Sequence, residues 1–409
     1  MFFPTMIVKQ SSLNEIKVIN LSNDNEAILD EEAYEMLTAI SKKDSRENCS
    51  QNELDFLSLL LESLDMTVAN GSKDLTIRSG DFENLEVYLA NTCNLRCKHC
   101  YFFGEGRHKI KKFIDFDVLV NTIVDAEKMG LYKIKLCGGE PLTYYRMKEL
   151  CHFLNSRSIS TTIISNGLLL HKFLDELDNS KVSFVISLDG FASSHDYLRG
   201  KRTFERTRSN IEKAVKAGFD VQINMAVYDR NVNDIDSFTD LVKNMGVSGL
   251  NMQVVRPVGM AADKLKGSTI VDESFLRRIH QNELEDQASK VENGSSFCTS
   301  CKTGLTIDFN NDVIGCPFIS AKPIGNLCSS ESLEKIQERS LKENPLYFVR
   351  EKADCLSCEL FNVVCAGGCR ARAKRMTGSI YACDYWIPFL LNHPKFKESK
   401  KEAWEYLLI

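Results

Sequence analysis

The pattern of hydrophobic and polar residues divides the chain into segments, and residues 1–80 form the first of them. Three short apolar runs predict strands, at 6–10, 16–21 and 26–29. Two amphipathic stretches predict helices, at 31–43 and 52–64. Asp30 stands where the N-cap of the first helix is expected. The polar stretch Ala69–Asp81 predicts a linker, so this segment is expected to be a small unit of three strands and two helices.

Residues 85–260 alternate strand patterns with helix patterns. Six apolar runs predict strands, at 85–91, 132–138, 160–167, 182–190, 221–228 and 250–257. Amphipathic stretches predict helices, at 118–130, 146–157, 209–218 and 236–246. This alternation is typical of an α/β fold with a parallel sheet, and it fits a partial (β/α)6, TIM-like barrel about as well as an open sheet. In such a barrel, chemistry is expected at the carboxyl ends of the strands.

The remainder of the chain has a different character. Residues 261–297 form a bridging region, and residues 298–409 show little apolar periodicity before a final helix pattern at 398–409. A segment with so little apolar patterning needs another source of order, and metal ligation can supply it.

Composition and charge narrow the choice of partners. The chain has 51 basic and 56 acidic residues and a net charge of −5, which gives no electrostatic reason to expect a nucleic-acid partner or an anionic membrane surface. The first residues lack a basic region ahead of an apolar core, and no apolar stretch is long enough for a spanning helix. We therefore expect a cytoplasmic protein, in which thiols stay reduced.

Cysteines are the most informative residue type. The chain has 15 of them, and eleven fall in two groups. The first group is Cys93, Cys97 and Cys100. The second group comprises Cys298, Cys301, Cys316, Cys355, Cys358, Cys365, Cys369 and Cys383. This clustering in a reducing compartment indicates metal or cluster ligation rather than disulfides.

The first group follows the first predicted barrel strand with the spacing CxxxCxxC. Three thiolates suit a [4Fe–4S] cluster that leaves one iron open for a substrate or cofactor. A structural zinc site normally has four protein ligands, and His99 or His108 would complete one here. A zinc knuckle is therefore the alternative interpretation.

This spacing resembles the radical S-adenosylmethionine (radical SAM) superfamily, and the resemblance continues at the ends of the next three predicted strands. The matching segments are Gly138-Gly139-Glu140-Pro141, Ser165-Asn166-Gly167, and Ser187-Leu188-Asp189-Gly190 followed by His195 to Arg199. Taken singly, each motif is also compatible with a turn that has no function. Their order and their strand-end positions favour the radical SAM interpretation.

The resemblance implies an S-adenosylmethionine site with its contacts in this chain. Gly138, Gly139 and Glu140 are expected at the methionyl amine, where glycines permit close backbone approach and a carboxylate accepts from an ammonium. The remaining expected contacts are Asn166 in its strand-end motif, Ser187 and Asp189 on the ribose side, Arg199 at the cofactor carboxylate, and His99 near the adenine.

The second cysteine group resembles the SPASM extension, which carries two auxiliary [4Fe–4S] clusters. The resemblance implies that Cys301, Cys316 and Cys369 hold one cluster, with Cys298 as the fourth ligand. Cys355, Cys358, Cys365 and Cys383 would hold the other. Two zinc ions in a zinc ribbon are the alternative for these eight cysteines.

The match to the SPASM pattern has three departures. Asn311 replaces a glycine, and asparagine is the residue next most able to adopt a left-handed turn. Six residues rather than five separate Cys358 from Cys365. Cys298 lies only three residues before Cys301, and without its ligation one iron would be open to a substrate thiolate.

The four remaining cysteines have simpler interpretations. Cys151 shares a helix face with apolar neighbours and is expected in the core. Cys137 directly precedes the glycine turn, and packing is favoured over a role in the site. Cys49 and Cys328 lie in polar loops with no identifiable partner.

The resemblance also implies a function. SPASM enzymes mostly act on peptides, and the first 80 residues resemble the winged-helix RiPP recognition element, which binds a leader peptide by strand addition. A capping subdomain without peptide affinity is the alternative. The expected activity is that of a radical SAM oxidoreductase that matures a ribosomal precursor peptide by an intramolecular cross-link, a thioether first and a carbon–carbon bond second. A reductant such as flavodoxin or ferredoxin is implied.

Two other functions remain open. An anaerobic sulfatase-maturating enzyme forms formylglycine, but Pro317 stands where that family has an aspartate after the cysteine equivalent to Cys316. A zinc-ribbon protein that binds nucleic acid or a partner is the third, and the net charge of −5 gives it little support.

Overall fold

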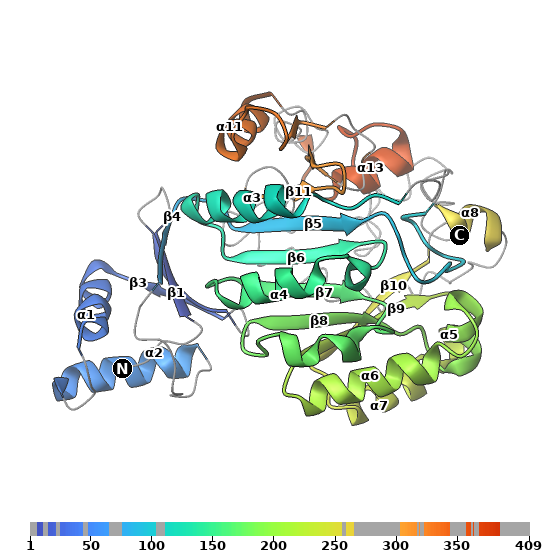
Figure 1. Cartoon of the computed structure of the whole chain (residues 1–409), viewed down its shortest axis with the longest axis horizontal. Helices are drawn as coiled ribbons and strands as arrows, with labels where there is room; N and C mark the ends of the chain where they lie inside the picture. Colours follow the sequence, from blue (N-terminus) through green and yellow to red (C-terminus); the bar gives the residue numbers. More distant parts are fainter. Residues whose placement is uncertain are drawn as a thin grey trace.

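The computed structural model describes most of the chain and contains two sheets (Figure 1). The described residues are 6–10, 15–21, 25–43, 48–64, 76–103, 111–255, 259–265, 303–316, 319, 323–343, 357–360, 363 and 368–384. One sheet has four strands in the order β3-β2-β1-β4, and the other has nine in the order β10-β9-β8-β7-β6-β5-β11-β12-β13. In the described part of the chain, no helix is long and apolar enough to cross a bilayer.

The N-terminal sheet confirms the three strands and two helices predicted there. These elements are β1 Met6–Gln10, β2 Ile16–Asn20, β3 Glu26–Leu29, α1 Glu31–Ser41 and α2 Gln51–Ser63. Asp30 caps α1 as predicted, because its side chain accepts a hydrogen bond from the Ala33 N–H at 2.8 Å. Ser50 and Glu53 form a reciprocal capping box at the start of α2.

The predicted linker was wrong in part, because it contains a fourth strand. Strand β4, Thr76–Ser79, pairs in parallel with β1. A run of four residues is too short to predict a strand when asparagine, glycine and serine, which are typical of turns, surround it. Main-chain pairing with β1, which the local sequence does not encode, stabilises it.

The larger sheet confirms all six predicted barrel strands. They are β5 Asn84–Ala90, β6 Lys133–Gly138, β7 Ser160–Ser165, β8 Val182–Ser187, β9 Asp220–Val227 and β10 Gly249–Val254. Each pairs in parallel with the next along the chain. This sequential order is that of a barrel wall, whereas a doubly wound sheet reverses its order at a switch point. Among the described residues the barrel is open, because β10 lies at an edge of the sheet and pairs only with β9.

The helices connect these strands and cover one side of the sheet. They are α3 Phe116–Lys128, α4 Met147–Asn155, α5 Ala192–Arg199, α6 Phe204–Lys216 and α7 Ile235–Asn244. The 3-10 turns are η2 Pro141–Thr143, η3 Leu170–Lys172, η4 Leu174–Glu176 and η5 Val232–Asp234. Helix α5 was not predicted as a helix, although its residues carry the last motif segment, because its mostly polar sequence has no apolar period.

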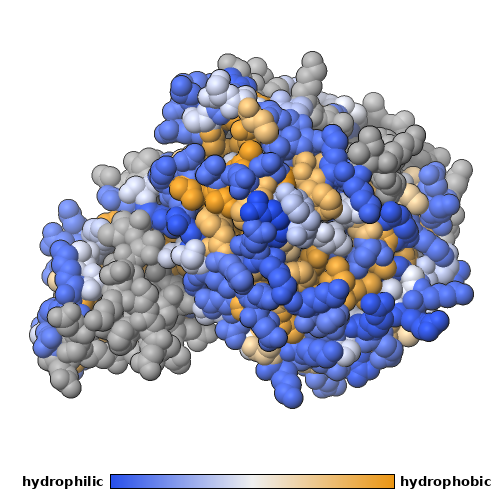
Figure 2. All heavy atoms as spheres, in the orientation of Figure 1, coloured by the Kyte–Doolittle hydropathy of each residue, from blue (hydrophilic) through white to orange (hydrophobic). Residues whose placement is uncertain are grey.

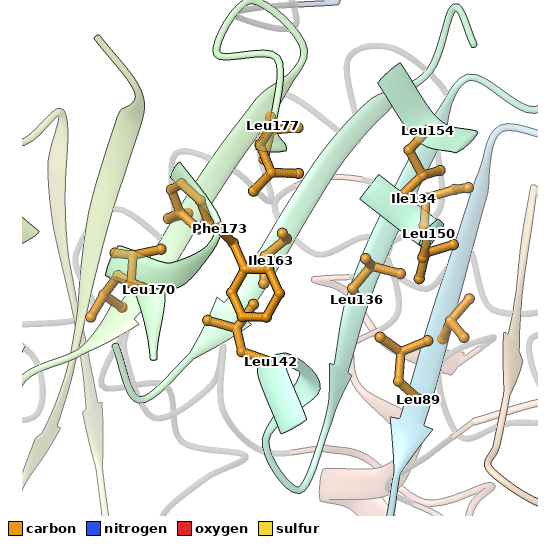
Figure 3. Packing of buried hydrophobic residues seen from close by; sticks show 14 of the residues in the cluster. Leu89, Ile134, Leu136, Leu142, Leu150, Leu154, Ile163, Leu170, Phe173 and Leu177 are labelled. Atoms are coloured by element: carbon orange, nitrogen blue, oxygen red, sulfur yellow. The ribbon is translucent and has the colours of Figure 1, made fainter. Parts of the chain in front are cut away.

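The core lies between the sheet and these helices (Figure 3). Leu89, Ile134, Leu136 and Ile163 point from the strands toward leucines of the covering turns and helices. Cys151 is fully buried in this cluster, which confirms its expected packing role. Seen in the orientation of Figure 1, hydrophilic side chains cover most of the described surface, with hydrophobic patches between them (Figure 2).

The C-terminal segment is more regular than predicted. It contains β11 Gly304–Ile307, β12 Asp312–Ile314, β13 Gly325–Asn326, α11 Leu333–Glu343 and α13 Arg370–Thr377, and α8 Met260–Lys264 precedes it. Strand β11 pairs in parallel with β5 and extends the barrel sheet. Leu305 and Ile307 are buried in the same core, so the segment gains order from that sheet as well. The predicted final helix at 398–409 lies outside the described residues.

Asn311 has the backbone conformation that its place in the cysteine pattern predicts. Its φ of 63° is left-handed, as expected for a residue that replaces glycine. Its side-chain oxygen accepts from the Asp115 N–H at 3.2 Å, which ties this turn to the start of α3.

The N-terminal sheet contacts the amino ends of the barrel strands. Tyr132, just before β6, packs with Ile7, Ile19 and Leu21 and donates to the Glu26 carboxylate at 3.4 Å. Lys9 is almost fully buried and forms an ion pair with Glu83, just before β5, at 2.9 Å. The N-terminal sheet therefore lies at the opposite end of the strands from their carboxyl ends (Figure 1).

Candidate active site

The first cysteine group follows β5 directly, as predicted. Cys97 is buried, and Cys93 and Cys100 are half-buried. Cys93 and Cys100 pack against an apolar cluster formed by Tyr88, Phe102, Phe103 and Cys137. Burial raises the pKa of the Cys93 thiol to about 12 and that of the Cys97 thiol to about 11, and the neighbouring thiols add to the shift. Three thiolates at this place therefore need a compensating positive group.

This donor set fits a [4Fe–4S] cluster. Within the described ranges, no three His, Cys, Asp or Glu side chains converge closely enough to hold a single metal ion. A [4Fe–4S] cluster does not require that convergence, because each cysteine binds a different iron. The soft thiol donors and their apolar surroundings are those that iron–sulfur clusters use.

The end of β6 approaches the end of β5 closely, and the glycines make this possible. Gly138 has a φ of 123°, and a Cβ atom there would lie 2.6 Å from the Ala90 carbonyl oxygen. At Gly139 a Cβ atom would lie 2.2 Å from the Thr92 carbonyl oxygen. The Gly139 N–H also donates a hydrogen bond to the Ala90 carbonyl oxygen at 2.8 Å. The close contact is thus with the strand that leads into the cysteine loop.

Glu140 is buried and holds the ends of β6 and β7 together. Its carboxylate accepts from the Ser165 hydroxyl at 2.7 Å, the Asn166 N–H at 2.9 Å and the Leu142 N–H at 3.2 Å. Burial raises the pKa of the Glu140 carboxyl group to about 6, although these hydrogen bonds lower it. Three of its acceptor positions are therefore occupied within the protein, and one remains for an external donor.

Asn166 connects the end of β7 to the cysteine loop. Its Nδ2 donates to Asn94 Oδ1 at 2.7 Å and lies 3.8 Å from the Cys93 sulfur. The peptide N–H of Leu95 also contacts that sulfur, at 3.3 Å. The second and third predicted motifs are therefore joined to the first by direct contacts.

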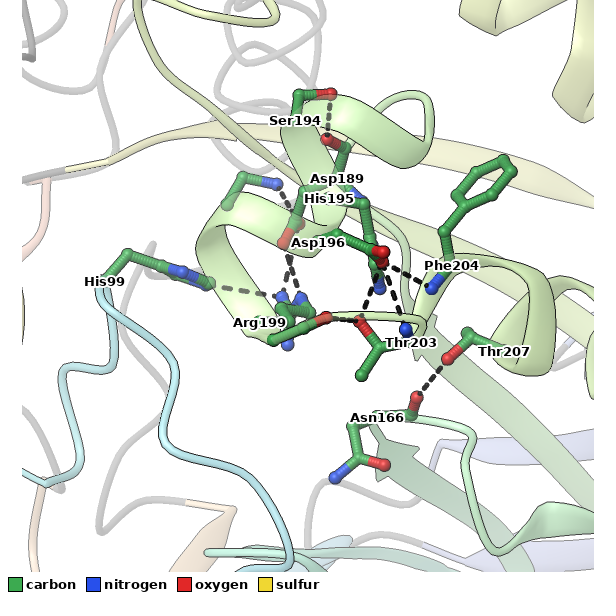
Figure 4. A network of polar contacts seen from close by, with 12 residues as sticks. His99, Asn166, Asp189, Ser194, His195, Asp196, Arg199, Thr203, Phe204 and Thr207 are labelled. Carbon is green, nitrogen blue, oxygen red and sulfur yellow. Dashed lines mark hydrogen bonds and ion pairs between the residues drawn. The ribbon is translucent and has the colours of Figure 1, made fainter.

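Asp189 and Arg199 form a buried ion pair at the end of β8 (Figure 4). Asp189 is fully buried, and its Oδ1 also accepts from the Ala226 N–H at 2.8 Å. Burial alone would raise the pKa of the Asp189 carboxyl group, but the charge of Arg199 lowers it to about 2. The pair is thus charged at neutral pH, and it fixes the guanidinium beside the cysteine loop.

His99 extends this network toward the cysteines. Its Nε2 lies 3.3 Å from Arg199 Nη2, and its Nδ1 is buried without a hydrogen-bond partner in the described part of the chain. Burial and the charge of Arg199 lower the pKa of the His99 imidazole to about 4, so the ring is neutral at pH 7. Since the arginine can only donate, Nε2 accepts and the proton lies on Nδ1. The site therefore offers an unused buried donor, which fits a heterocyclic acceptor such as adenine.

His195 and Asp196 support the same region from α5. His195 is fully buried and its Nδ1 accepts from the Asp189 N–H at 3.0 Å. Asp196 accepts from the N–H groups of Arg202, Thr203 and Phe204, and so stabilises the turn before α6. These two motif residues position the backbone around the ion pair.

One polar residue near this site was not identified from the sequence. Asn224 pairs in register with Ser187 on the neighbouring strand, and its buried Oδ1 has no hydrogen-bond partner in the parts of the chain described. The signal was present, because Gln222 and Asn224 alternate with buried apolar residues along β9. A buried strand of a parallel sheet is otherwise apolar on both faces.

The second cysteine group is described only in part. Cys316, Cys358, Cys369 and Cys383 lie in the described residues, whereas Cys298, Cys301, Cys355 and Cys365 lie outside them. Asp384 is buried, accepts from the Cys369 N–H at 2.6 Å and forms an ion pair with Arg372. This contact joins the backbones of Cys369 and Cys383. Pro317 also lies outside the described residues.

Comparisons with known proteins agree with the arrangement of the barrel. The family model "Radical SAM superfamily" matches residues 87–242, so the chain carries a radical SAM domain. Such a domain implies a [4Fe–4S] cluster and S-adenosylmethionine. The chain is 28% identical over 317 residues to the mycofactocin maturase MftC of Mycolicibacterium smegmatis, which covers 71% of this chain and 78% of that protein. It is 26% identical over 327 residues to the AdoMet-dependent heme synthase of Methanosarcina barkeri, covering 71% and 91%.

Solved structures share the fold. SuiB of Streptococcus suis, bound to the precursor peptide SuiA, superposes with a TM-score of 0.66 at 17% identity and covers 95% of this chain and 99% of that one. The anSMEcpe protein with bound AdoMet has a TM-score of 0.58 at 19% identity and covers 79% of this chain and 96% of that one.

Proposed function

We propose that this chain is a radical SAM maturase that modifies a ribosomal precursor peptide. The observation that carries the proposal is the convergence at the carboxyl ends of β5 to β8 of three thiols, a buried aspartate–arginine pair and a neutral histidine with an unused donor. The bound cluster and cofactor supply a 5′-deoxyadenosyl radical by reductive cleavage of S-adenosylmethionine.

The residues of the chain bind and orient the cofactor in this proposal. Cys93, Cys97 and Cys100 ligate the cluster. Arg199 binds the carboxylate through its Nη1 donors, which form no hydrogen bond with the described residues. The remaining contacts are the Gly138–Gly139 backbone and Glu140 at the amine, Asn166 beside the cysteine loop, Ser187 and Asp189 on the ribose side, and His99 at the adenine. Asp189 has a second task, because it holds Arg199 in place.

The N-terminal sheet supports a peptide substrate. Strand β3 lies at one edge of that sheet, and its Ile28 side chain is 68% exposed. An edge strand presents unpaired N–H and C=O groups that an extended leader peptide can pair with. The likeness to the mycofactocin maturase and to SuiB bound to its precursor peptide points in the same direction.

We further propose that the product contains an intramolecular thioether, or otherwise a carbon–carbon cross-link. Closing such a bond after hydrogen abstraction releases an electron. The cysteines between Cys298 and Cys383 are proposed to hold two auxiliary [4Fe–4S] clusters that accept it, and a flavodoxin or ferredoxin is proposed as the initial reductant. Formylglycine formation is less well supported, because Pro317 replaces the expected base and the anSMEcpe likeness covers 79% of the chain against 95% for SuiB.

The test is anaerobic reconstitution followed by metal analysis and turnover. We expect about twelve irons per chain, from three clusters, and 5′-deoxyadenosine after addition of dithionite and S-adenosylmethionine. A Cys97→Ala variant is the matched control and should form no 5′-deoxyadenosine. A precursor peptide encoded beside the gene should lose the mass of two hydrogens per cross-link. Zinc in place of iron would overturn the proposal.

A further inference from the structure

The two faces of the barrel sheet have different chemical character. On one face the strand residues are apolar, buried and packed against the helices (Figure 3). The residues between them point to the other side, which we call the inner face. It carries Tyr88, Cys137 and Ile164, which pack with Cys93 and Cys100. The inner face is therefore the side on which the cysteine site lies.

Farther from the cysteines the inner face becomes polar. Its side chains there include Lys133, Ser160 and Asp220 at the starts of their strands, followed by Glu86, Lys135, Thr162, Ser183, Gln222, Asn224, Asn251 and Gln253. Four of them are exposed, namely Lys135, Gln222, Asn251 and Gln253. A parallel sheet normally buries apolar side chains on both faces, so an exposed polar face is a departure that the fold itself does not require.

Lys135 is the exposed cation of this face on β6. It lies in register between Glu86 on β5 and Thr162 on β7, and three residues before Gly138. At about 3.3 Å per residue it stands about 10 Å along the strand from the glycine turn. It forms no ion pair with any side chain in the described ranges. Glu86 instead lies 3.7 Å from the Cys137 sulfur.

On the opposite part of the inner face, the side chains beyond Asp220 at the start of β9 are neutral. Gln222, Asn251 and Gln253 each offer an amide that both donates and accepts hydrogen bonds. In register, Asn224 pairs with Asn251, and Ala226 with Gln253. Neutral amides suit the main chain of a peptide, whereas an exposed lysine suits a carboxylate.

We propose that the inner face binds the segment of the substrate peptide that is modified, and that Lys135 selects an acidic side chain in that segment. Gln222, Asn251 and Gln253 hold the peptide main chain beside it. This inference rests on the proposed function and names a sequence requirement of its substrate: an aspartate or glutamate close to the modified residue.

The test is selection from a displayed library of random peptides on the reconstituted full chain with S-adenosylmethionine. We expect aspartate and glutamate to be enriched on the wild-type protein, to lose enrichment on Lys135→Met, and to give way to lysine and arginine on Lys135→Glu. Lys135→Arg should retain the acidic preference. An acidic peptide from the selection should bind at least about tenfold more weakly to Lys135→Met, as is typical when one hydrogen bond to a charged group is lost.

Two control variants locate the effect. Lys216→Glu reverses an exposed charge on the outer helix α6 and should leave the enrichment unchanged. Ile28→Glu alters the edge strand β3 and should also keep the acidic preference. A wild-type selection without acidic enrichment, or the same enrichment on Lys135→Glu, would overturn the inference. So would an acidic preference that disappears in Ile28→Glu but not in Lys135→Glu.

The result can be separated from failure of the proposed function. Formation of 5′-deoxyadenosine by the wild-type chain tests the radical chemistry without any peptide. If it forms but no acidic preference appears, only the role of Lys135 is overturned. If it does not form, the proposed function fails, and the inference fails with it.

Discussion

Glu140 and Asp189 are both buried carboxylates at the ends of barrel strands, yet they have opposite electrostatic properties. Glu140 accepts from a hydroxyl and two peptide N–H groups, and its pKa rises to about 6 because burial outweighs these hydrogen bonds and the weaker influence of Arg199, with which it forms no ion pair. Asp189 is paired with Arg199, and its pKa falls to about 2. Hydrogen bonds from neutral groups therefore orient a buried carboxylate, whereas a full positive charge in direct contact is what brings its pKa below the ordinary range.

The largest expected effect comes from breaking the charged pair. Asp189→Asn leaves the Arg199 guanidinium buried without its counter-ion and should destabilise the protein by about 3 to 5 kcal/mol. Denaturant unfolding at pH 7 measures this change. Asp178→Asn is the matched control, since its partner Lys181 lies in a partly exposed pair and its loss should cost less than about 1 kcal/mol.

A double variant sharpens this expectation. Adding Arg199→Met to Asp189→Asn removes the uncompensated charge, so part of the lost stability should return. Costs that simply add would show that the two side chains act independently, against the ion pair described here.

A smaller effect is expected at Glu140, and it depends on pH. The folded pKa of about 6 exceeds the ordinary glutamate value of 4.5, so the folded state binds the proton more tightly. Glu140 therefore stabilises the protein below pH 4.5, and this contribution is lost as pH rises through 6, by about 2 kcal/mol. Glu140→Gln should remove this slope from the difference between the two unfolding curves. An unchanged slope would mean that Glu140 is not responsible for it.

The smallest effect is expected at His195, beside Asp189. Burial lowers the pKa of its imidazole to about 4, because the loss of hydration outweighs the attraction of Asp189, and the charge of Arg199 lowers the pKa further. Its NMR signals should thus stay constant between about pH 5.5 and pH 8. A titration of His195 in that range would show that the Asp189 region is more accessible to water than its burial indicates.

Much of the barrel could be predicted from the sequence because its signals are local. Each of the six strands is an apolar run bounded by turn residues, and each motif follows its strand directly. The resemblance to the SPASM pattern puts Asn311 at a glycine position, where a left-handed turn is expected, and its φ of 63° is left-handed. Strands β4 and β11 were missed because their pairing partners are far away in the sequence.

Side-chain partners were harder to predict than positions. The sequence assigned Glu140 to an external ammonium, whereas three internal donors occupy most of its capacity. The exposed Lys135 on β6 belongs to no sequence motif. That it lies on the same face as the cysteine site can be seen only when the alternation of side chains is followed across six strands. Such partners depend on how distant elements meet, which no local pattern records.

Under the proposed function, the attachment of the N-terminal sheet to the amino ends of β5 and β6 would set a minimum length for the peptide substrate. From Tyr132 to Gly138 the strand spans about 20 Å at 3.3 Å per residue. A peptide anchored on β3 and modified at the carboxyl ends must bridge at least that distance, which takes about six residues in extended form. The length of this spacer would then decide which residues are modified. Peptide residues fewer than about six positions from the segment bound on β3 would stay unmodified, whatever their chemistry.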